Sequence, residues 1–310
     1  MRIAILHQDL EKPEKEFKKI FENKGIQTDL FDIRNTKPET LYSYDCVMNR
    51  VYASVANRDY KDNLQTLKLL TSLEANGVIC INSSHTTKVD YSKAYSASVM
   101  KAYGVLTPET LKINSIDEKE KAIQFAKRFG YPLIIKRDMG GRSKDIFKID
   151  SSKQLKDTIN YFFTPEVLNE YNAGIVVQQF VKTTKPHDCR IAIVNGEFAY
   201  AFARTLISED NSDGWLASIA RGSKAHEYSP DEKTIELAKN ATEAIGALWN
   251  EVDITFTEQG PVIIENNPTP NFVSYAEERM NKAADLAIQE TTFQKYGTSE
   301  TKMEVIQNEK

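Results

Sequence analysis

Apolar residues in the first 82 positions fall into short continuous runs separated by amphipathic stretches. Four of these runs predict buried strands: RIAIL, TDLFDI, DCVMNRV and VICIN. Between them, residues 13–25 and 64–73 place apolar side chains at helical spacing, and the first of these helices starts with a proline and ends at a glycine. This β-α-β order predicts a small parallel sheet covered by helices.

The next part of the chain alternates helical and strand patterns on a shorter scale. The polar stretch SSHTTKVD predicts a domain boundary, after which Asp90 caps a helix that ends at Gly104. There follow a strand entered through Pro108, a helix with a capping box at Ser115, the strands YPLIIK and IFKI, and a helix opened by Ser151. Together they predict a compact α+β module that ends near residue 173.

Strand patterns dominate most of the remaining chain. IVVQQFV predicts a buried strand, and CRIAIV pairs with EFAYAFAR across Asn195-Gly196, a strong hairpin signal. Residues 207–229 carry few apolar anchors and predict a loop-rich region near a site. A last helix is predicted over 274–289, and the polar tail from Thr291 onwards is expected to be frayed.

The segment EVDITFTEQGPVIIENNPTPN predicts two short strands joined by a tight loop. If the hairpin closes symmetrically about Gln259, Asp253 lies opposite Glu265, and Asn267 follows two positions on along the same face. Opposed residues have Cβ atoms about 5 Å apart, so the two carboxylates repel unless a positive charge lies between them. Magnesium is the natural candidate, because it keeps coordination places for phosphate oxygens. A solvated hairpin whose acids face water is the alternative.

Composition narrows the class of protein without identifying it. The 310 residues allow two or three domains, and the net charge of -4 gives no electrostatic case for nucleic acid or an anionic membrane as a partner. Three scattered cysteines indicate a reducing compartment, and the four histidines show no metal-ligand spacing. Since the chain opens on a strand and no apolar run approaches a membrane span, a cytoplasmic location is expected.

Several residues allow more than one interpretation. Lys136 ends an apolar strand just before two glycines, which suits phosphate binding, but a surface lysine with its stem along the protein is the alternative. The loop GGRSK lacks the P-loop spacing, and neither a dinucleotide fingerprint nor a G-x-S-x-G elbow is present. Cys189 lies within an apolar strand and is expected to be a structural thiol rather than a nucleophile. Arginine suits a bidentate grip on phosphate or carboxylate, which makes Arg190, Arg204 and Arg221 candidates as well as ordinary surface charges.

The order of these motifs resembles the ATP-grasp superfamily, and within it the RimK/LysX-like carboxylate–amine ligases. The order comprises Lys93, YPLIIK with its two glycines, VVQQFV, HDCRIAIVNGE, ARG and DI–IIENNPTPNF. The resemblance is strongest at Asp188-Cys189-Arg190, which looks like the family's D-x-R, and at Glu265-Asn266-Asn267-Pro268, which looks like its E-x-N-P. It runs from Arg2 to about Gln289, and the matches are specific jointly rather than singly.

The resemblance implies the ATP-grasp fold, of mixed α/β and α+β class. It assigns residues 1–88 to an N-terminal pre-ATP-grasp α/β domain and residues 89–173 to a central lid domain. Residues 174–290 would form the C-terminal ATP-grasp domain, and residues 291–310 a flexible tail. ATP would be held between the lid domain and the C-terminal domain.

Carried over by motif, the resemblance also implies roles for individual residues. Lys93 and Lys136 would meet the nucleotide phosphates, and Asp253, Glu265 and Asn267 would ligate Mg²⁺, with Mn²⁺ as the alternative ion. Arg204 and Arg221 would face the transferred phosphoryl group or the acceptor carboxylate. The remaining residues assigned to cofactor binding are Gly140, Gly141, Ser143, Gln178, Gln179, Phe180, Val181, Asp188 and Arg190, with Gln178 to Val181 on the adenine.

The activity that the resemblance implies is ligation of a carboxylate to an amine. The acceptor, a small amino acid or the carboxylate of a peptide or protein, attacks the γ-phosphate, and an amine donor then displaces phosphate from the acylphosphate. No side-chain nucleophile is needed, and a closed lid keeps water out. A homo-oligomer, dimer or tetramer, is expected, with neither nucleic acid nor a membrane as partner.

Three departures from the family pattern keep a second function open, a non-ligating nucleotide-binding protein with a regulatory or scaffold role. Gln179 stands where Glu is frequent, and Ser218 stands where Asn is frequent. The lid loop GGRSKDI is charged, and it either folds over phosphate through Arg142, Ser143 or Lys144 or is impaired. Phosphorylation of a substrate without ligation is a third possibility.

Overall fold

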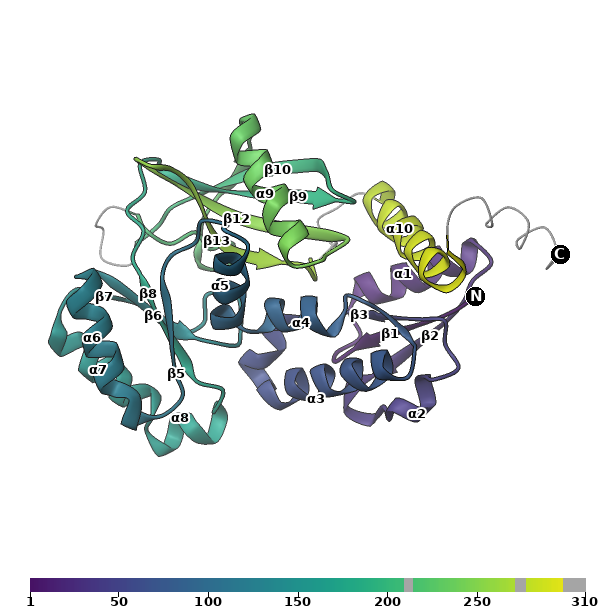
Figure 1. Cartoon of the computed structure of the whole chain (residues 1–310), viewed down its shortest axis with the longest axis horizontal. Coiled ribbons are helices and arrows are strands. Elements are labelled where there is room, and N and C mark those ends of the chain that lie inside the picture. The colour runs from purple at the N-terminus through teal and green to yellow at the C-terminus, as the bar shows by residue number, and fades with distance from the viewer. Residues whose placement is uncertain (209–213, 271–276, 298–310) are drawn as a thin grey trace. The chain divides into compact units, whose positions relative to one another are not determined.

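The computed structural model describes residues 1–208, 214–270 and 277–297, and it forms two compact units (Figure 1). The first unit comprises residues 1–51 and 64–87 together with the described part of 269–310. The second comprises residues 52–63 and 88–268. The three-domain division expected from the sequence stays a prediction.

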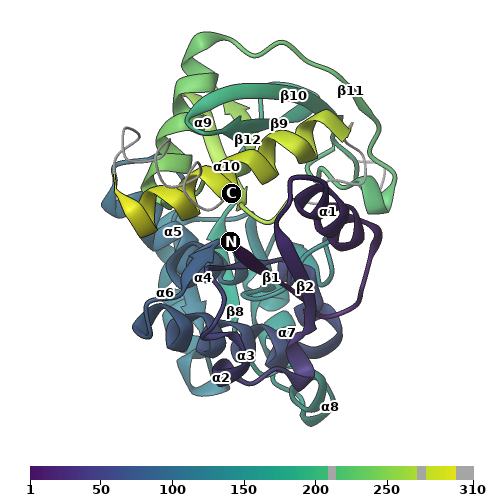
Figure 2. The ribbon, with the colours of Figure 1, turned by 90° about the vertical axis from the view of Figure 1, so that its right-hand side faces the viewer.

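The first unit contains a parallel sheet with strand order β2-β1-β3-β4. Its strands alternate with helices, as the sequence predicts, and β3 is buried along its whole length. Figures 1 and 2 both show α10 beside α1, and an ion pair between Lys24 and Asp285 joins the end of α1 to α10 at 2.7 Å. The elements are β1 (Arg2–His7), α1 (Lys12–Asn23), β2 (Gln27–Asp32), η1 (Ile33–Asn35), α2 (Pro38–Leu41), β3 (Cys46–Asn49), α3 (Ala56–Ala75), β4 (Ile79–Ile81), α4 (Ser84–Tyr91) and α10 (Glu277–Tyr296).

A buried ion pair ties α1 to the end of β3 in this unit. Glu14 Oε1 lies 3.6 Å from Arg50 Nε, and both side chains are almost fully buried. The other carboxylate oxygen of Glu14 accepts a hydrogen bond from the backbone N–H of Glu11 and so helps to cap α1. Arg50 also donates to the carbonyl of Pro270 at 2.8 Å, and its guanidinium lies over the ring of Phe17. One guanidinium therefore links three segments that are distant in sequence.

The second unit contains two antiparallel sheets. The smaller has strand order β5-β8-β6-β7, and one face packs on α6 and α7 through residues such as Ile135, Leu155 and Ile159. Figure 1 shows these two helices together on that sheet. The elements are η2 (Ala53–Val55), α5 (Lys93–Ala102), β5 (Thr110–Ile113), η3 (Ile116–Glu118), α6 (Lys119–Phe129), β6 (Leu133–Arg137), β7 (Ile146–Ile149), α7 (Ser152–Phe162), α8 (Pro165–Glu170) and β8 (Ile175–Gln179).

The larger sheet of this unit has strand order β11-β10-β9-β12-β13. Its apolar face packs on α5 and α9, with Cys189, Ile191 and Val252 among the buried residues. The predicted hairpin across Asn195-Gly196 is present, since β9 pairs with β10. The elements are β9 (His187–Val194), β10 (Glu197–Thr205), η4 (Ile219–Arg221), β11 (Ala225–Glu227), α9 (Glu232–Ala244), β12 (Trp249–Thr257) and β13 (Gly260–Asn267).

Three local expectations are corrected by the structure. Most of SSHTTKVD forms the helix α4 rather than a polar break, and Glu74 accepts from the backbone N–H of its first residue, Ser84; the division between the two units nevertheless falls within this stretch, between residues 87 and 88. The next helix is capped by Ser92 rather than by Asp90, since the Ser92 side chain accepts from the Tyr95 N–H. The last helix runs to Tyr296, beyond the predicted end at 289, so the tail expected to be frayed from 291 is helical at its start, where Thr291 is fully buried; the predicted first residues of the helix, 274–276, and the rest of the tail from 298 lie outside the described residues.

Within the described parts of the chain, none of the helices combines the length and the apolar character that a bilayer crossing requires. The sequence contained no apolar run of that kind either.

We predict that Glu14→Gln destabilises the protein by about 3–5 kcal/mol, because it leaves the charge of Arg50 buried without its acidic partner. Urea unfolding followed by circular dichroism measures the change. Glu22→Gln is the matched control on the same helix, since its half-exposed pair with Lys18 is worth at most about 1 kcal/mol. Equal losses in the two variants would contradict the role given to the buried pair.

Candidate active site

The hairpin of β12 and β13 brings the two predicted acids face to face. Asp253 pairs with Glu265, and Glu251 pairs with Asn267, as symmetric closure about Gln259 predicts. Nearer the turn the register shifts, because a bulge after Asp253 places Ile254 opposite Ile263. The strands therefore close about a two-residue turn, while the acids keep the predicted pairing.

The acids lie on a polar face that extends across neighbouring strands of the sheet. Asp188 and Arg190 on β9 share this face, while Cys189 between them points into the apolar core. Burial raises the pKa of the Cys189 thiol far above its ordinary value, so it is a structural thiol and not a nucleophile. Because residues two apart share a face, each of these strands contributes several polar side chains to one surface.

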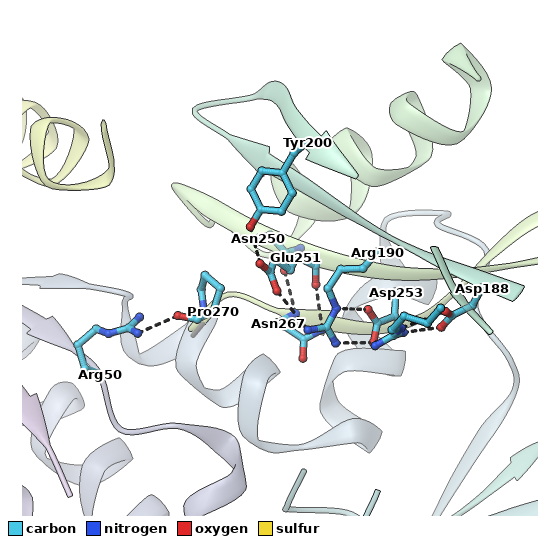
Figure 3. A network of polar contacts seen from close by, with 10 residues as sticks. Arg50, Asp188, Arg190, Tyr200, Asn250, Glu251, Asp253, Asn267 and Pro270 are labelled. Atoms are coloured by element: carbon cyan, nitrogen blue, oxygen red, sulfur yellow. Dashed lines mark hydrogen bonds and ion pairs between the residues drawn. The ribbon is translucent and has the colours of Figure 1, made fainter. Parts of the chain in front are cut away.

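Asp253 is held by two arginines rather than facing water. Arg190 grips it through Nε to Oδ1 at 2.6 Å and Nη2 to Oδ2 at 2.9 Å (Figure 3). Arg204 Nη2 lies 3.0 Å from the same Oδ2, and Arg204 is also hydrogen-bonded to Asp188. Burial pushes the pKa of Asp253 upward, but the two guanidinium groups outweigh it and hold the pKa below its ordinary value. The alternative of a solvated hairpin is therefore wrong for Asp253.

The second acid has a different partner and is more open. Lys93 Nζ lies 3.5 Å from Glu265 Oε1, and it also donates to the carbonyl of Gly140 at 2.8 Å. The side chain of Glu265 is 36% exposed, against 6% for Asp253. A ligand that reaches Glu265 therefore does not need to open the buried network first.

The donor atoms fit a hard divalent cation. Asn267 Nδ2 donates to the carbonyl of Glu251 at 2.9 Å, which leaves the amide Oδ1 as its ligand atom. That oxygen would join the carboxylates of Asp253 and Glu265 in an all-oxygen set, which is the kind that Mg²⁺ prefers. In the part of the chain that the structure describes, no group of three or more His, Cys, Asp or Glu side chains is placed to hold a metal, in keeping with a set of two acids and one amide. A cation that binds Asp253 has to replace at least one arginine contact.

Lys136 is buried at the end of β6, so the alternative of a surface lysine is wrong. Its exposure is 7%, and burial lowers its pKa to about 8 although the nearby acid Glu265 raises it. A desolvated ammonium in this position attracts an anion strongly.

One cavity joins most of the predicted site residues. It lies between the β5-β8-β6-β7 sheet and the polar face of the larger sheet, and the end of β8 lines one side of it. Trp215, Leu216 and Ala217, from the predicted loop-rich region, line it as well. The predicted residues among its lining are Lys93, Lys136, Gly140, Gly141, Ser143, Gln178, Gln179, Phe180, Val181, Asp188, Arg204, Asp253 and Glu265.

Three predicted residues are not among the described residues that line this cavity. Arg190 and Asn267 lie beside it on the same polar face, next to Asp253 and Glu251 respectively. Arg221 is exposed on the short turn η4. Of the arginines assigned to the reacting groups, the structure thus places Arg204 in the cavity and Arg221 outside it.

The charged lid loop also borders the cavity. Arg142, Ser143 and Lys144 all line it, which is the position that folding over phosphate requires. The loop is closed by an ion pair between Arg137 and Asp145 at 2.6 Å.

Some residues that shape the site were missed by sequence reasoning. Asp138 is fully buried and accepts from the backbone N–H of Ala94 at 2.8 Å, which fixes the start of the helix that carries Lys93. Asn57 donates to the carbonyl of Gly141 at 2.8 Å and accepts from its N–H at 3.2 Å. For Asp138 the available signal was an acid two residues before the first glycine, and for Asn57 it was a polar helix start 84 positions before Gly141.

Glu251 and Tyr200 were missed too. Glu251 is 3% exposed, accepts a hydrogen bond from the Tyr200 hydroxyl at 2.5 Å and contacts Arg190 Nη1 at 3.2 Å. Its position two residues before Asp253 placed it on the polar face, and that was the available signal.

Comparison with known families identifies a match over most of the chain. The RimK-like ATP-grasp domain matches residues 90–290, a range that contains every predicted site residue. The first 89 residues lie outside this match.

Two curated relatives and one solved structure illustrate the similarity. The chain is 24% identical over 300 residues to a "Probable alpha-L-glutamate ligase" of Parasynechococcus marenigrum (strain WH8102), covering 94% of this chain but only 61% of that protein. It is 27% identical over 240 residues to "Alpha-aminoadipate--LysW ligase LysX" of Sulfurisphaera tokodaii, covering 77% of each. The crystal structure of a RimK domain ATP-grasp protein from Sphaerobacter thermophilus superposes with a TM-score of 0.66 at 16% identity, covering 93% of this chain and 98% of that one.

We predict that Lys136 titrates with a pKa of about 8 in the ligand-free protein. Carbon-13 NMR of reductively methylated protein measures it, with Lys136→Arg to assign the resonance. Glu265→Gln lowers this pKa further, and Asp253→Asn lowers it less, because Glu265 is the acid that stabilises the ammonium most. A pKa unmoved by Glu265→Gln would contradict the arrangement.

Proposed function

Because the chain belongs to the RimK-like ATP-grasp family, we propose that it is an ATP-dependent ligase that joins a carboxylate to an amine through an acylphosphate, with release of ADP and phosphate. The observation that carries the proposal is one cavity lined by Lys93 and Lys136, by two opposed acids and by a strand end. Lysines suit phosphates, and paired acids suit the cation that accompanies them.

The nucleotide takes the length of the cavity in this proposal. Its adenine lies against the strand end from Gln178 to Val181, and its phosphates reach Lys93 and Lys136. The N–H of Gln179 already bonds the carbonyl of Glu109, so the backbone groups for adenine come from the residues that follow it. Ser143 and the two glycines of the lid loop border the phosphate end.

Asp253, Glu265 and Asn267 are the residues that would hold Mg²⁺, or Mn²⁺ in its place. The ion supplies charge neutralisation on the outer phosphates. Glu265 is the most exposed of the two acids, so it is the one that a cation reaches without disturbing the arginines.

The remaining cationic groups act on the carboxylate that is phosphorylated. Arg204, held by Asp188, lies in the cavity beside Asp253 and stabilises charge on the transferring oxygens. Arg221 is proposed for the same group, from the short turn η4 outside the described lining of the cavity. The amine then attacks the acylphosphate carbon, and the lid loop excludes water.

The substrates are proposed only by class. One relative's name specifies glutamate and the other's specifies alpha-aminoadipate and LysW, and the chain spans 61% of the first relative's length. For this chain we therefore propose only the substrate classes: the carboxylate of an amino acid, peptide or protein as acceptor, and an amine as donor. A homo-oligomer and a cytoplasmic location are part of the same proposal.

The test is ADP release with a matrix of carboxylate acceptors and amine donors, and mass spectrometry of the product. We expect turnover that requires both an acceptor and a donor. The product should be an amide whose mass exceeds that of the acceptor by the mass of the donor less one water molecule. ATP binding without turnover across the matrix, or a phosphorylated product that accumulates without amide, would contradict ligation.

Glu265→Gln should lower kcat/KM by about a hundredfold, since each metal-binding or charge-stabilising group at such a site is worth about 3 kcal/mol. Glu258→Gln, in the exposed turn of the same hairpin, is the control and should retain full activity. A Glu265→Gln enzyme with wild-type activity would contradict the proposal that this hairpin binds the metal ion.

Nucleotide affinity should fall as the pH rises through about 8. Lys136 carries its charge below this pKa and loses it above, so its attraction for phosphate weakens on the alkaline side. Calorimetric titration with ADP between pH 7 and 9.5 measures the effect. The Lys136→Met variant should bind ADP more weakly over this pH range and should lose the pH dependence. If the variant showed the same pH profile as the wild type, contact between Lys136 and phosphate would be contradicted.

A further inference from the structure

The guanidinium of Arg190 is divided between two acids on the same strand. Its Nε and Nη2 face Asp253 as a fork, while Nη1 contacts Glu251 Oε2 at 3.2 Å (Figure 3). Asp253 is a proposed metal ligand, and Glu251 has no role in the function proposed above. The question is why a second acid is held beside this arginine.

Glu251 is built into the sheet rather than placed there loosely. Its side chain is 3% exposed, and its other oxygen accepts from the Tyr200 hydroxyl, which projects from β10. A buried carboxylate is costly unless it is paired and hydrogen-bonded, and here both oxygens have partners. Figure 3 shows Tyr200, Glu251 and Arg190 in succession along the face toward Asp253.

This group continues the polar face beyond the end of the cavity. The register along β12 runs from Thr255 through Asp253 to Glu251, and the first two line the cavity while Glu251 does not. If the nucleotide fills the cavity and its outer phosphates end at Asp253, the acceptor approaches over Arg190 and Glu251. That inference rests on the proposed function.

We propose that Glu251, oriented by Tyr200, is a positioning residue that holds Arg190 in place when Asp253 turns to a metal ion. The Nε–Nη2 edge of Arg190 then becomes the bidentate site for the acceptor carboxylate. Arginine is suited to this exchange, because its planar fork binds one carboxylate in the same geometry as another. Nη1 stays with Glu251 throughout, so the guanidinium does not follow Asp253 or leave the face.

The charge of Glu251 has a second effect. It balances part of the charge of Arg190, and without it more of that charge would fall on Asp253, which already makes the shorter contacts at 2.6 and 2.9 Å. That charge would hold Asp253 away from a divalent ion and repel the ion as well. Loss of Glu251 therefore weakens both metal binding and acceptor binding.

The variants are Glu251→Gln and Tyr200→Phe, with Glu258→Gln in the exposed turn as the matched control. Electron paramagnetic resonance of Mn²⁺ titrated into the protein with saturating ADP measures metal affinity without turnover. Steady-state kinetics then separate the acceptor KM from kcat and from the ATP KM. Thermal unfolding reports whether each variant is folded.

For Glu251→Gln we expect Mn²⁺ affinity to fall about tenfold and the acceptor KM to rise about tenfold, the size of one lost charge-assisted contact. The ATP KM should change less than twofold. The change in kcat should be smaller than the changes in Mn²⁺ affinity and in acceptor KM. Tyr200→Phe keeps the charge and loses only one hydrogen bond, so both effects should be about two- to threefold. Glu258→Gln should match the wild type.

A folded Glu251→Gln protein with wild-type Mn²⁺ affinity and acceptor KM would overturn the proposal and leave Glu251 a purely structural residue. If that variant does not fold, Tyr200→Phe decides by the same two readouts. Failure of the proposed function is a separate result, because the wild-type protein itself would then show no amide-forming turnover with any acceptor and donor, whatever its Mn²⁺ affinity.

Discussion

The contact on which the site depends is the grip of Arg190 and Arg204 on Asp253. Asp253 is buried in the middle of a sheet, where an unpaired carboxylate would take up a proton or destabilise the fold. Two guanidinium groups keep it ionised, and each has a further acid, Glu251 for Arg190 and Asp188 for Arg204. The face is thus a chain of alternating charges, and no member can be replaced without changing its neighbours' partners.

This alternation prepares the face for charged ligands. Lys93 and Glu265 extend it to β13, so its four acids meet four bases once buried Lys136 is counted. A polyanion accompanied by a divalent cation adds charges of both signs and can enter by exchange of partners. Charges already fixed by the fold need little reorganisation when the ligand arrives, which is the usual source of electrostatic catalysis.

The sequence predicted what depends on neighbours along the chain. The pairing of Asp253 with Glu265 follows from strand alternation and a short turn, and it is confirmed. The β-α-β order and the hairpin at Asn195 are confirmed for the same reason. The family and its fold are confirmed as well, because several short motifs in a fixed order are jointly specific. The roles of individual site residues stay predictions.

What the sequence did not predict depends on partners far along the chain. Glu251 looked like an ordinary strand residue, since its partners Arg190 and Tyr200 are 61 and 51 positions away. Lys136 allowed a surface interpretation because burial is set by the sheet that packs against it. SSHTTKVD is polar yet helical, since Glu74, ten residues earlier, satisfies its first N–H group.

Asn57 shows how far such contacts reach. It precedes the leucine-rich part of its helix, yet residues 52–63 belong to the unit that contains the lid loop. The side-chain amide of Asn57 hydrogen-bonds both the N–H and the carbonyl of Gly141, as the backbone of a neighbouring strand would. Lys144 Nζ donates to the backbone carbonyl of Asn57 at 3.0 Å. Glycine at position 140 is favoured by a φ of 131°, and a Cβ there would also lie 2.7 Å from Asn57 Oδ1 and displace that side chain. The glycine at position 140 is therefore explained by the backbone conformation and a protein contact, before any phosphate is considered.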